Sequence, residues 1–272
     1  MTDVIYQYWD GADTPGNTAG SGAMRAYAAR IGADYIYEHN PRFVTDLGPY
    51  SPHYGAFKPI YDDRFDAYDY VLFADTDVFP VNALVDDVFA AMRAHPDADV
   101  GICEEWQQPE MRKKHDSAGG IGNTNDERWA ALVSGTWNAQ IPRTPEGLPR
   151  VFNSGVVWYS KAGRHLARER FIPFRDYVRL VQAARLPAFY TCDQPYLHAM
   201  LSMCKISWEV LDYRWNSSVH YMPGTRGPVR PVNDLRAGAA FVHVQLGGAD
   251  HFSEEKLRHL VNTPAADWSL PL

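Results

Sequence analysis

Asp75 and Asp77, two aspartates with one residue between them, are the residues of this sequence best suited to binding a cation. They follow the apolar run 70–74 in the stretch YVLFADTDVFP. Such a run is typical of a buried strand in a parallel sheet, and ligands bind at the carboxyl ends of these strands. Aspartates are rarely buried unless they are paired or bind a metal, and hard oxygen ligands suit Mn²⁺ or Mg²⁺. The alternative is a solvated turn in which one aspartate caps the next helix.

Other polar residues also stand where predicted elements begin or end. His243 closes an apolar run just before two glycines, so it is either a metal ligand or a core histidine. Glu104 and Glu105 close another run and could contact an acceptor or act as a base. Lys58 begins a predicted helix, where it either contacts a phosphate or is simply solvated.

The elements that position these residues alternate between strand and helix. We expect strands at residues 4–8, 35–37, 70–74, 99–103, 151–159, 208–211 and 239–244. We expect helices at residues 21–31, 57–65, 83–93, 126–134, 163–184, 193–203 and 253–261. The predicted helix caps are Ser21, Asn82 and Asp193. Phe79-Pro80 is expected to stop the strand that leads into Asp75. The β-α-β opening predicts an α/β fold with a doubly wound, Rossmann-like mixed sheet flanked by helices.

Composition limits the classes of protein that this chain can belong to. With 272 residues and 46% apolar content, we expect a single domain over residues 1–272. The net charge of −7 argues against a nucleic-acid partner. The three cysteines share no Cys-x-x-Cys spacing, which favours a reducing compartment. No apolar run approaches the length of a transmembrane helix, so we expect a cytoplasmic protein, with peripheral membrane contact left open.

Residues 107–150 carry few signals of regular structure outside the predicted helix. The segment is rich in glycine and proline and includes the basic cluster Arg112–Lys114. A long segment of this kind is usually functional or disordered. We interpret it as a lid or acceptor loop, with disorder as the alternative.

Several short motifs, in order along the chain, together resemble the GT-A fold glycosyltransferases. The closest resemblance is to the retaining family 8 enzymes, the glycogenin and lipopolysaccharide galactosyltransferase group. The motifs are Asp75-Thr76-Asp77 (the DxD motif), Asn153-Ser154-Gly155, Asp193-Gln194, Leu211-Asp212 with Trp215-Asn216, and His243 with Gly247 or Gly248. The segment MRAYAARIGADY is also similar to one in retaining galactosyltransferases of family 34.

This resemblance implies a metal-dependent transfer of a hexose from a nucleotide-diphosphate sugar, expected to be a UDP-sugar, to a hydroxyl of a glycan or glycolipid, with retention of configuration. It implies that Asp75, Asp77 and His243 hold Mn²⁺ (or Mg²⁺), which bridges to the diphosphate. Asn153, Asp193 and Gln194 would face the donor sugar and the acceptor. The further donor contacts implied are Tyr6, Gln7, Tyr8, Asp13, Lys58, Asp75, Thr76, Gly247 and His251.

One departure from the family pattern concerns the residue that contacts the donor phosphates. The family has a lysine after the late histidine, whereas this chain reads GGADHF there. His251, Lys58 or the Arg112–Lys114 cluster could take over its role.

Three alternative functions remain open at this stage. An inverting glycosyltransferase would use Glu104 or Glu105 as its base. A nucleotide-sugar-binding protein would have lost transfer, which the missing lysine favours. A haloacid-dehalogenase-type phosphatase also has Asp-x-Asp after a strand, but it wants Thr or Val where this chain has Phe79, and its motif lies nearer the N-terminus.

Overall fold

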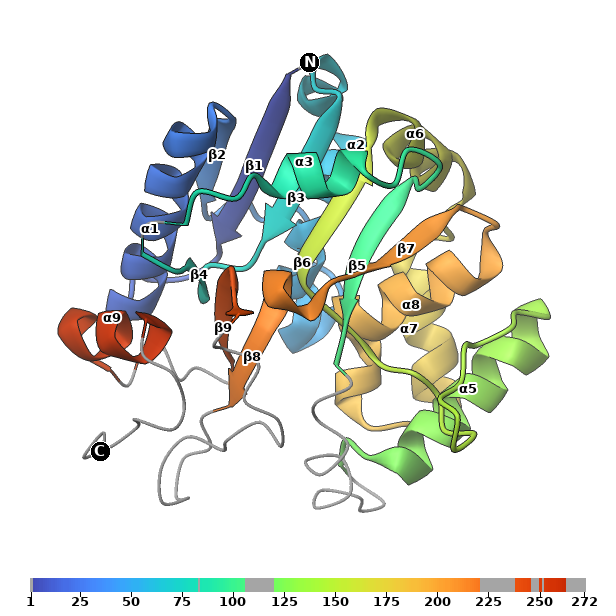
Figure 1. Cartoon of the computed structure of the whole chain (residues 1–272). Helices are drawn as coiled ribbons and strands as arrows, with labels where there is room; N and C mark the ends of the chain where they lie inside the picture. Colours follow the sequence, from blue (N-terminus) through green and yellow to red (C-terminus); the bar gives the residue numbers. More distant parts are fainter. Residues whose placement is uncertain are drawn as a thin grey trace.

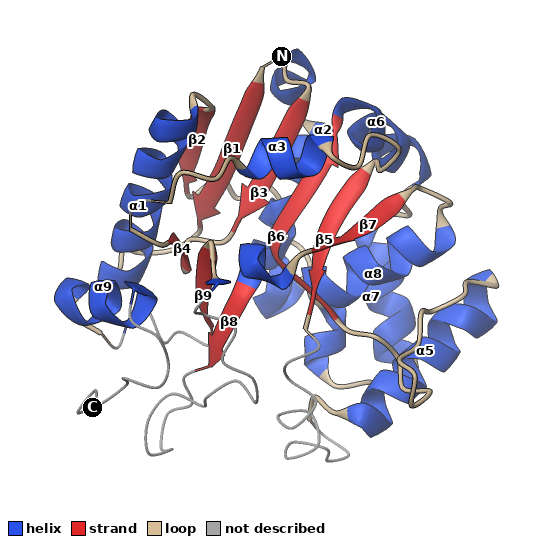
Figure 2. Cartoon of the chain, viewed as in Figure 1, coloured by secondary structure: helices blue, strands red, loops and turns tan. Residues whose placement is uncertain are grey.

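The core of the molecule is a six-stranded mixed sheet with strand order β2-β1-β3-β6-β5-β7 (Figures 1 and 2). The computed structural model describes residues 2–82, 84–105, 120–220, 238–245, 250 and 252–262. The strands of this sheet are β1 (Asp3–Trp9), β2 (Asp34–His39), β3 (Tyr70–Ala74), β5 (Val100–Glu104), β6 (Phe152–Ser160) and β7 (Trp208–Leu211). Strand β6 runs antiparallel to β3 and β5, whereas the other pairs are parallel. The predicted mixed α/β sheet is therefore confirmed.

Alternating residues of the strands build two cores, one on each face of the sheet. On one face, Val71 and Phe73 pack with α2 (Lys58–Tyr61), α7 (Phe174–Ala183) and α8 (Asp193–Met203). On the other face, Leu72 and Ala74 pack with α1 (Pro15–Ile31) and α3 (Val88–Arg93). Because side chains alternate along a strand, a strand covered on both faces reads as a continuous apolar run. This is why the run before Asp75 was recognisable in the sequence.

A second sheet of three strands begins immediately after the Asp-Thr-Asp turn. Its order is β4-β9-β8, with β4 (Val78–Pro80) antiparallel to β9 (Phe241–Gln245) and β9 parallel to β8 (Ser217–His220). Figure 1 places it below the arrowheads of β1 and β3. The prediction that Phe79-Pro80 simply ends the strand was wrong, because these residues pair with β9. The turn at Asp75–Asp77 thus joins two sheets.

Several helix boundaries also differ from the sequence prediction. Helix α1 begins at Pro15 rather than near Ser21, because Thr14 and Asn17 form a capping box. Asp87, not Asn82, caps the shorter helix α3. Cys192 is the residue before α8, so Asp193 occupies the first turn and is not the cap. Gly32 ends α1 in the left-handed conformation (φ 71°), as a helix-terminating glycine does.

Two predicted helices are each divided in two. Residues 57–65 form α2 and the 3₁₀ helix η2 (Asp63–Ala67), separated by one residue. Residues 163–184 form α6 (Lys161–Arg170) and α7, because Pro173 cannot continue a helix from α6. The remaining elements are the 3₁₀ helices η1 (Gly48–Phe57), η3 (Ala188–Thr191) and η4 (Tyr213–Asn216), and the helices α5 (Asn123–Trp137) and α9 (Glu254–Asn262).

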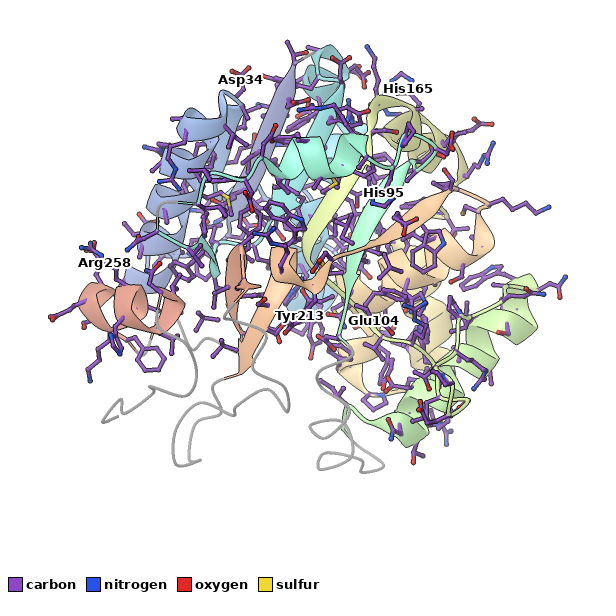
Figure 3. The ribbon with its side chains drawn as sticks, in the orientation of Figure 1. Asp34, His95, Glu104, His165, Tyr213 and Arg258 are labelled. Atoms are coloured by element: carbon purple, nitrogen blue, oxygen red, sulfur yellow. The ribbon has the colours of Figure 1, made fainter. Side chains whose placement is uncertain are left out.

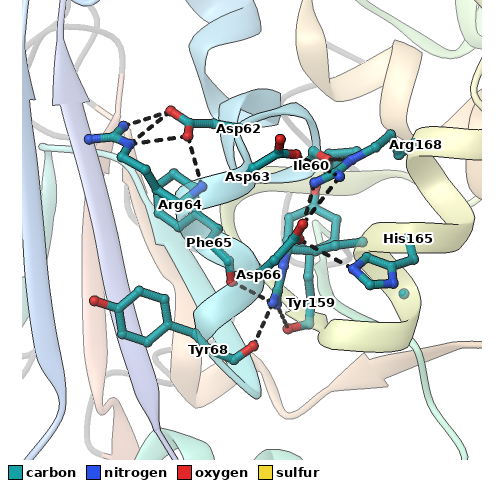
Figure 4. Close-up of polar contacts among 12 residues, drawn as sticks. Ile60, Asp62, Asp63, Arg64, Phe65, Asp66, Tyr68, Tyr159, His165 and Arg168 are labelled. Atoms are coloured by element: carbon teal, nitrogen blue, oxygen red, sulfur yellow. Dashed lines mark hydrogen bonds and ion pairs between the residues drawn. The ribbon is translucent and has the colours of Figure 1, made fainter.

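A fully buried arginine, Arg164 of α6, ties the chain together at the edge of the sheet where β3 begins. Its guanidinium donates to the carbonyl oxygens of Phe65 (2.8 Å), Tyr68 (2.6 Å) and Tyr159 (3.3 Å). Figure 3 shows the neighbouring His165 near the top of the molecule, well above Glu104. Figure 4 shows how closely the three acceptor residues approach one another. Arg164 is therefore a structural residue, remote from the Asp-Thr-Asp turn.

Candidate active site

Asp75, Asp77 and His243 come together where the two sheets meet. One ligand atom from each residue lies within 4.8 Å of the others. His243 Nε2 is 3.1 Å from Asp77 Oδ1 and 3.8 Å from Asp75 Oδ2. The histidine side chain is 4% exposed, whereas those of Asp75 and Asp77 are 38% and 30% exposed. The cluster is therefore buried on the histidine side and open to solvent on the carboxylate side.

Four surrounding elements hold the backbone of the Asp-Thr-Asp turn. The Asp75 amide donates to the Gly155 carbonyl (2.8 Å), and the Asp77 carbonyl accepts from the Val244 amide (2.9 Å). Gln7 Nε2 donates to the Asp75 carbonyl (2.8 Å). Gly20 of α1 packs so closely that a Cβ there would lie 1.8 Å from the Thr76 carbonyl oxygen. The turn is thus pre-organised rather than a loosely solvated loop.

The charges of the cluster favour a bound cation. Desolvation and the neighbouring Asp77 carboxylate raise the pKa of Asp75 well above its ordinary value, against the opposing effect of His243. Burial tends to lower the pKa of His243, but Asp77 and Asp75 outweigh it and raise that pKa. In the part of the chain that the structure describes, neither carboxylate has a lysine or arginine partner. Two carboxylate oxygens and one imidazole nitrogen therefore fit a divalent cation such as Mn²⁺ or Mg²⁺.

A chain of buried amides leads away from the back of His243. His243 Nδ1 is 2.9 Å from Asn216 Oδ1, and Asn216 Nδ2 donates to Asn153 Oδ1 (2.8 Å). Asn153 Nδ2 in turn donates to Gln194 Oε1 (3.3 Å) and Glu105 Oε1 (3.1 Å). The structure thus connects the cation-binding cluster with Asn153 and Gln194, two of the residues that the sequence predicted to face the sugar.

Asp193 lies beside Gln194 at the start of α8 and is held by two side chains. Ser154 Oγ donates to Asp193 Oδ2 (2.5 Å), and His53 Nδ1 lies 3.6 Å from Asp193 Oδ1. The carboxylate also sits in the first turn of α8, where the helix dipole favours negative charge. Asp193 is therefore pinned between β6 and η1 next to the amide chain.

Comparisons with known proteins place this arrangement of sheets and site in a fold class. No protein-family model matches the chain, and no curated protein sequence does either. A glycosyltransferase involved in the glycosylation of the major capsid of PBCV-1 matches with a TM-score of 0.50 and 13% identity, over 94% of this chain and 98% of that one. The bifunctional glycosyltransferase WbbM matches with a TM-score of 0.52 and 13% identity, over 89% of this chain and 45% of that one.

The fold is that of the GT-A glycosyltransferases. At 13% identity, this likeness establishes the fold and nothing finer. The galactosyltransferase LgtC, in complex with donor and acceptor sugar analogs, aligns over 99% of this chain with 14% identity and a TM-score of 0.47. Among the helices that the structure describes, none combines the length and the apolar character needed to cross a membrane.

Within this GT-A fold, several predicted donor contacts are occupied by protein partners. The Tyr6 hydroxyl donates to Glu38 Oε2 (2.9 Å), and Lys58 Nζ also binds Glu38 (2.7 Å). Gln7 is fully buried, with its amide bound to the Asp75 carbonyl and to the Tyr35 hydroxyl. Tyr6 and Gln7 therefore support the site from behind rather than facing a nucleotide. Lys58 has its charge satisfied by Glu38.

The remaining predicted contacts lie at the rim of the site or outside the described residues. The Tyr8 hydroxyl donates to the Pro52 carbonyl (2.7 Å), and Thr76 is buried in the turn. Asp13 is mostly exposed, 3.5 Å from His39 Nε2. Gly247, His251, the Arg112–Lys114 cluster and residues 107–119 of the predicted lid lie outside the described residues. What replaces the missing lysine is accordingly still a prediction.

The sequence reasoning did not foresee that two polar residues would support Asn153. Asn216 stood only in a motif resemblance, and Glu105 was considered only as a base or an acceptor contact. Both are buried, and both hydrogen-bond Asn153. The signal for Glu105 was its place after β5, but nothing local distinguishes Asn216, because its partners lie 63 and 27 residues away. Glu104, in contrast, forms an ion pair with Arg150.

Proposed function

We propose that this protein transfers a hexose from a nucleotide-diphosphate sugar, specifically a UDP-sugar, to a hydroxyl acceptor with the aid of a divalent cation. The observation that carries the proposal is the Asp75–Asp77–His243 cluster at the sheet edge of a GT-A fold. The proteins of similar fold are themselves described as glycosyltransferases. Breaking a sugar–phosphate bond leaves negative charge on the diphosphate, so charge stabilisation is the main requirement of the reaction.

Asp75, Asp77 and His243 would hold the cation, with the exposed carboxylates facing the donor. A divalent cation bound there supplies positive charge to the leaving diphosphate without any proton transfer. Gln7 and Gly155 keep the Asp75 backbone in place, so the carboxylates need little rearrangement when the donor binds. This pre-organisation is what a site that stabilises developing charge requires.

The sugar-side residues favour retention of configuration. Gln194 is a neutral amide and cannot act as the strong base that inversion requires. Glu104 is bound to Arg150, and Glu105 accepts a hydrogen bond from Asn153, so both alternative bases already have partners. Asn153 orients the Gln194 oxygen through its own amide (3.3 Å). We infer that Gln194 lies near the anomeric carbon, where a carbonyl oxygen stabilises positive charge.

A surface groove beside Asp193 suits the acceptor. This α7 groove, of about 520 Å³, is lined in part by Leu47, Tyr50, Arg175, Arg179 and Thr191. The Tyr50 ring packs on His53 (5.6 Å between ring centroids), and His53 contacts Asp193. An aromatic ring with neighbouring polar groups is a suitable surface for a carbohydrate. We propose that the acceptor lies in the α7 groove with its reacting hydroxyl toward Asp193 and Gln194.

The test is a donor screen with the purified full chain. Release of nucleoside diphosphate and formation of a glycoside are measured with several nucleotide sugars and with Mn²⁺, Mg²⁺ or EDTA. We expect transfer with a UDP-sugar and Mn²⁺, none in EDTA, and none for Asp77→Asn at any Mn²⁺ concentration. Donor binding without hydrolysis or transfer would favour the nucleotide-sugar-binding alternative. Full activity of Asp77→Asn in EDTA would contradict metal dependence.

A further inference from the structure

Asn216 stands between the cation-binding cluster and the sugar-side amides, and it contacts both. We propose that Asn216 is a positioning residue that keeps a proton on Nδ1 of His243, so that Nε2 is the nitrogen left to bind a cation held by Asp75 and Asp77. The inference rests on the proposed metal-dependent function. It assigns a role to a side chain that touches neither the cation nor the substrate.

The orientation of the amide chain follows from a group that can only donate. The backbone N–H of Gly155 lies 2.8 Å from Asn153 Oδ1. An N–H cannot accept a hydrogen bond, so the atom of Asn153 that faces it must be the carbonyl oxygen. The same oxygen lies 2.8 Å from Asn216. The atom of Asn216 that faces Asn153 must therefore be its amide nitrogen.

This orientation fixes which atom of Asn216 faces the histidine. With its nitrogen toward Asn153, Asn216 presents Oδ1 to His243 Nδ1 at 2.9 Å. A carbonyl oxygen only accepts, so this contact requires a proton on Nδ1. Nε2 lies 3.1 Å from Asp77 Oδ1, and because a carboxylate also only accepts, Nε2 carries a proton too while no cation is bound. A cation held by the aspartates would take the place of that Nε2 proton and leave the proton on Nδ1. A metal-binding histidine characteristically donates its other ring N–H to an oxygen in this way.

On the Nδ1 side of the ring, one neighbour opposes this assignment, and its contact is weaker than that of Asn216. Gln245 Nε2 lies 3.3 Å from His243 Nδ1 and 3.4 Å from Ser218 Oγ. As a donor, it would favour the other tautomer. However, both its contacts are longer than that of Asn216, and a serine hydroxyl can donate or accept, so it does not fix the orientation of the glutamine amide. The backbone N–H of Gly155 gives Asn216 an orientation that Gln245 lacks.

Because the two residues are buried, the hydrogen bond from Nδ1 to Asn216 is the main control on whether Nδ1 carries a proton. Asn216 is 1% exposed and His243 is 3% exposed as a whole residue, so bulk water does not compete for Nδ1. The ring also packs tightly against Gly155, where an added Cβ would lie 2.2 Å from Cε1. Removing the Asn216 oxygen should therefore leave the ring in place and remove the preference for a proton on Nδ1. Loss of such an outer partner typically lowers metal affinity 10- to 100-fold.

The experiment measures the tautomer and the cation affinity separately. Two-bond ¹⁵N–¹H spectra are recorded on metal-free Asp77→Ala protein, which lacks the carboxylate nearest Nε2, at a pH where the ring is neutral. They report which nitrogen of His243 carries the proton, and His243→Gln assigns the signal. Mn²⁺ affinity is measured by calorimetry with and without UDP. The variants are Asn216→Leu, which has similar volume but no acceptor, and Asn216→Asp, which keeps an acceptor. Asn125→Leu, a buried asparagine of α5, is the matched control.

In the Asp77→Ala background, we expect a proton on Nδ1 when residue 216 is Asn or Asp, and a shift of the proton toward Nε2 in Asn216→Leu. With Asp77 intact, Asn216→Leu should weaken Mn²⁺ binding about 10- to 100-fold. Asn125→Leu should bind Mn²⁺ as the wild type does. A proton on Nε2 in Asp77→Ala with Asn216 intact, or wild-type Mn²⁺ affinity in Asn216→Leu, would overturn the proposal and leave the proposed function standing. If Asn216→Leu does not fold, the tautomer of Asp77→Ala still decides. Failure of the wild-type protein to bind Mn²⁺, even with UDP, would instead overturn the metal-dependent function, and this role with it.

Discussion

Gly155 of β6 and His243 of β9 approach so closely that no side chain fits between them. A Cβ on Gly155 would lie 2.2 Å from His243 Cε1 and 2.7 Å from Nδ1. The carbonyl oxygen of the same glycine accepts a hydrogen bond from the Asp75 amide, and its own N–H donates one to Asn153 Oδ1. This one residue therefore sets the position of the imidazole, of the first aspartate and of the amide chain behind them. The Asn-Ser-Gly motif belongs to the site for this steric reason.

We predict that Gly155→Ala displaces His243 and lowers Mn²⁺ affinity at least tenfold, an effect in the range of a lost supporting contact. The overpacking should also cost about 1–3 kcal/mol in the free energy of unfolding. Calorimetric Mn²⁺ titration and urea unfolding measure the two effects. Gly22→Ala is the matched control, because a Cβ at this helical glycine meets nothing within 4 Å. Wild-type Mn²⁺ affinity in Gly155→Ala would contradict the steric argument.

Replacing Arg164 should lower the stability of the fold without changing the cation-binding cluster. Replacing it by methionine removes the guanidinium from three carbonyls. The Phe65 carbonyl keeps its hydrogen bond from the Tyr68 amide, whereas the carbonyls of Tyr68 and Tyr159 lose this donor at a cost of roughly 1–3 kcal/mol each. We therefore expect Arg164→Met to lose at least about 2 kcal/mol in the free energy of unfolding, measured in urea. The molecules that remain folded should keep wild-type Mn²⁺ affinity, because Arg164 lies at the opposite end of β3 from Asp75. Arg168→Met, on the more exposed side of α6, should cost less. Equal losses of stability in Arg164→Met and Arg168→Met would show that the burial of Arg164 does not decide its contribution.

The strands and their ends were largely predictable from the sequence, whereas the contacts across the fold were not. The apolar run before Asp75 is covered on both faces, so local composition sufficed to recognise it. Strands β4 and β8 have three and four residues, too few for a pattern to emerge. The start of α1 was missed because the capping box of Thr14 lies in a stretch that reads as a loop.

The site was predictable only where its residues share a motif. Asp75 follows β3, whose end was recognisable in the sequence, and Asp77 precedes β4. His243, predicted to end its strand, is instead the middle residue of β9, and the pairing of β9 with β4 brings it to the aspartates. The link from His243 through Asn216 to Asn153 spans long sequence separations, and no local pattern reports it. Lys58 was chosen for its charge at a helix start, but that choice could not foresee Glu38 on a neighbouring strand.

Glu38 should make the fold sensitive to acid. Burial works to raise its pKa, but hydrogen bonds from Lys58, Arg64 and Tyr6 outweigh this effect and hold the pKa below its ordinary value. A carboxyl whose pKa is lowered in the folded state stabilises the fold above its unfolded pKa of about 4.3 and loses that contribution as pH falls through the folded value. We expect the melting temperature of Glu38→Gln to fall less steeply below about pH 4.3 than that of the wild type. If the melting temperatures of the two proteins depend on pH in the same way, Glu38 and its hydrogen bonds contribute nothing to the acid sensitivity.

A substitution in the α7 groove should weaken acceptor binding and leave donor binding unchanged. Arg179 is exposed in this groove and has no ion-pair partner among the described residues. We expect Arg179→Glu to raise the KM for the acceptor about 10- to 100-fold, the loss of a charge-assisted hydrogen bond, and to leave the Kd for UDP with Mn²⁺ unchanged. Arg258→Glu makes the same charge change on α9, which lies on the opposite side of the molecule from α7 (Figure 1), and should be neutral. An unchanged acceptor KM in Arg179→Glu would place the acceptor elsewhere.

Gln194 provides the sharpest test of stereochemistry. Its carbonyl oxygen is oriented by Asn153 (3.3 Å), and its neighbour Asp193 is held by Ser154 and His53. Under the proposed function, an amide rather than a carboxylate therefore faces the reacting carbon. With an α-linked donor, we expect an α-linked product, read from the anomeric coupling constant by NMR. Gln194→Ala should lower kcat about 10²- to 10³-fold, as the loss of one stabilising dipole does, with donor Kd nearly unchanged. Glu105→Gln should keep the α-configuration of the product and retain measurable turnover. A β-linked product, abolished in Glu105→Gln, would instead make Glu105 the base of an inverting enzyme.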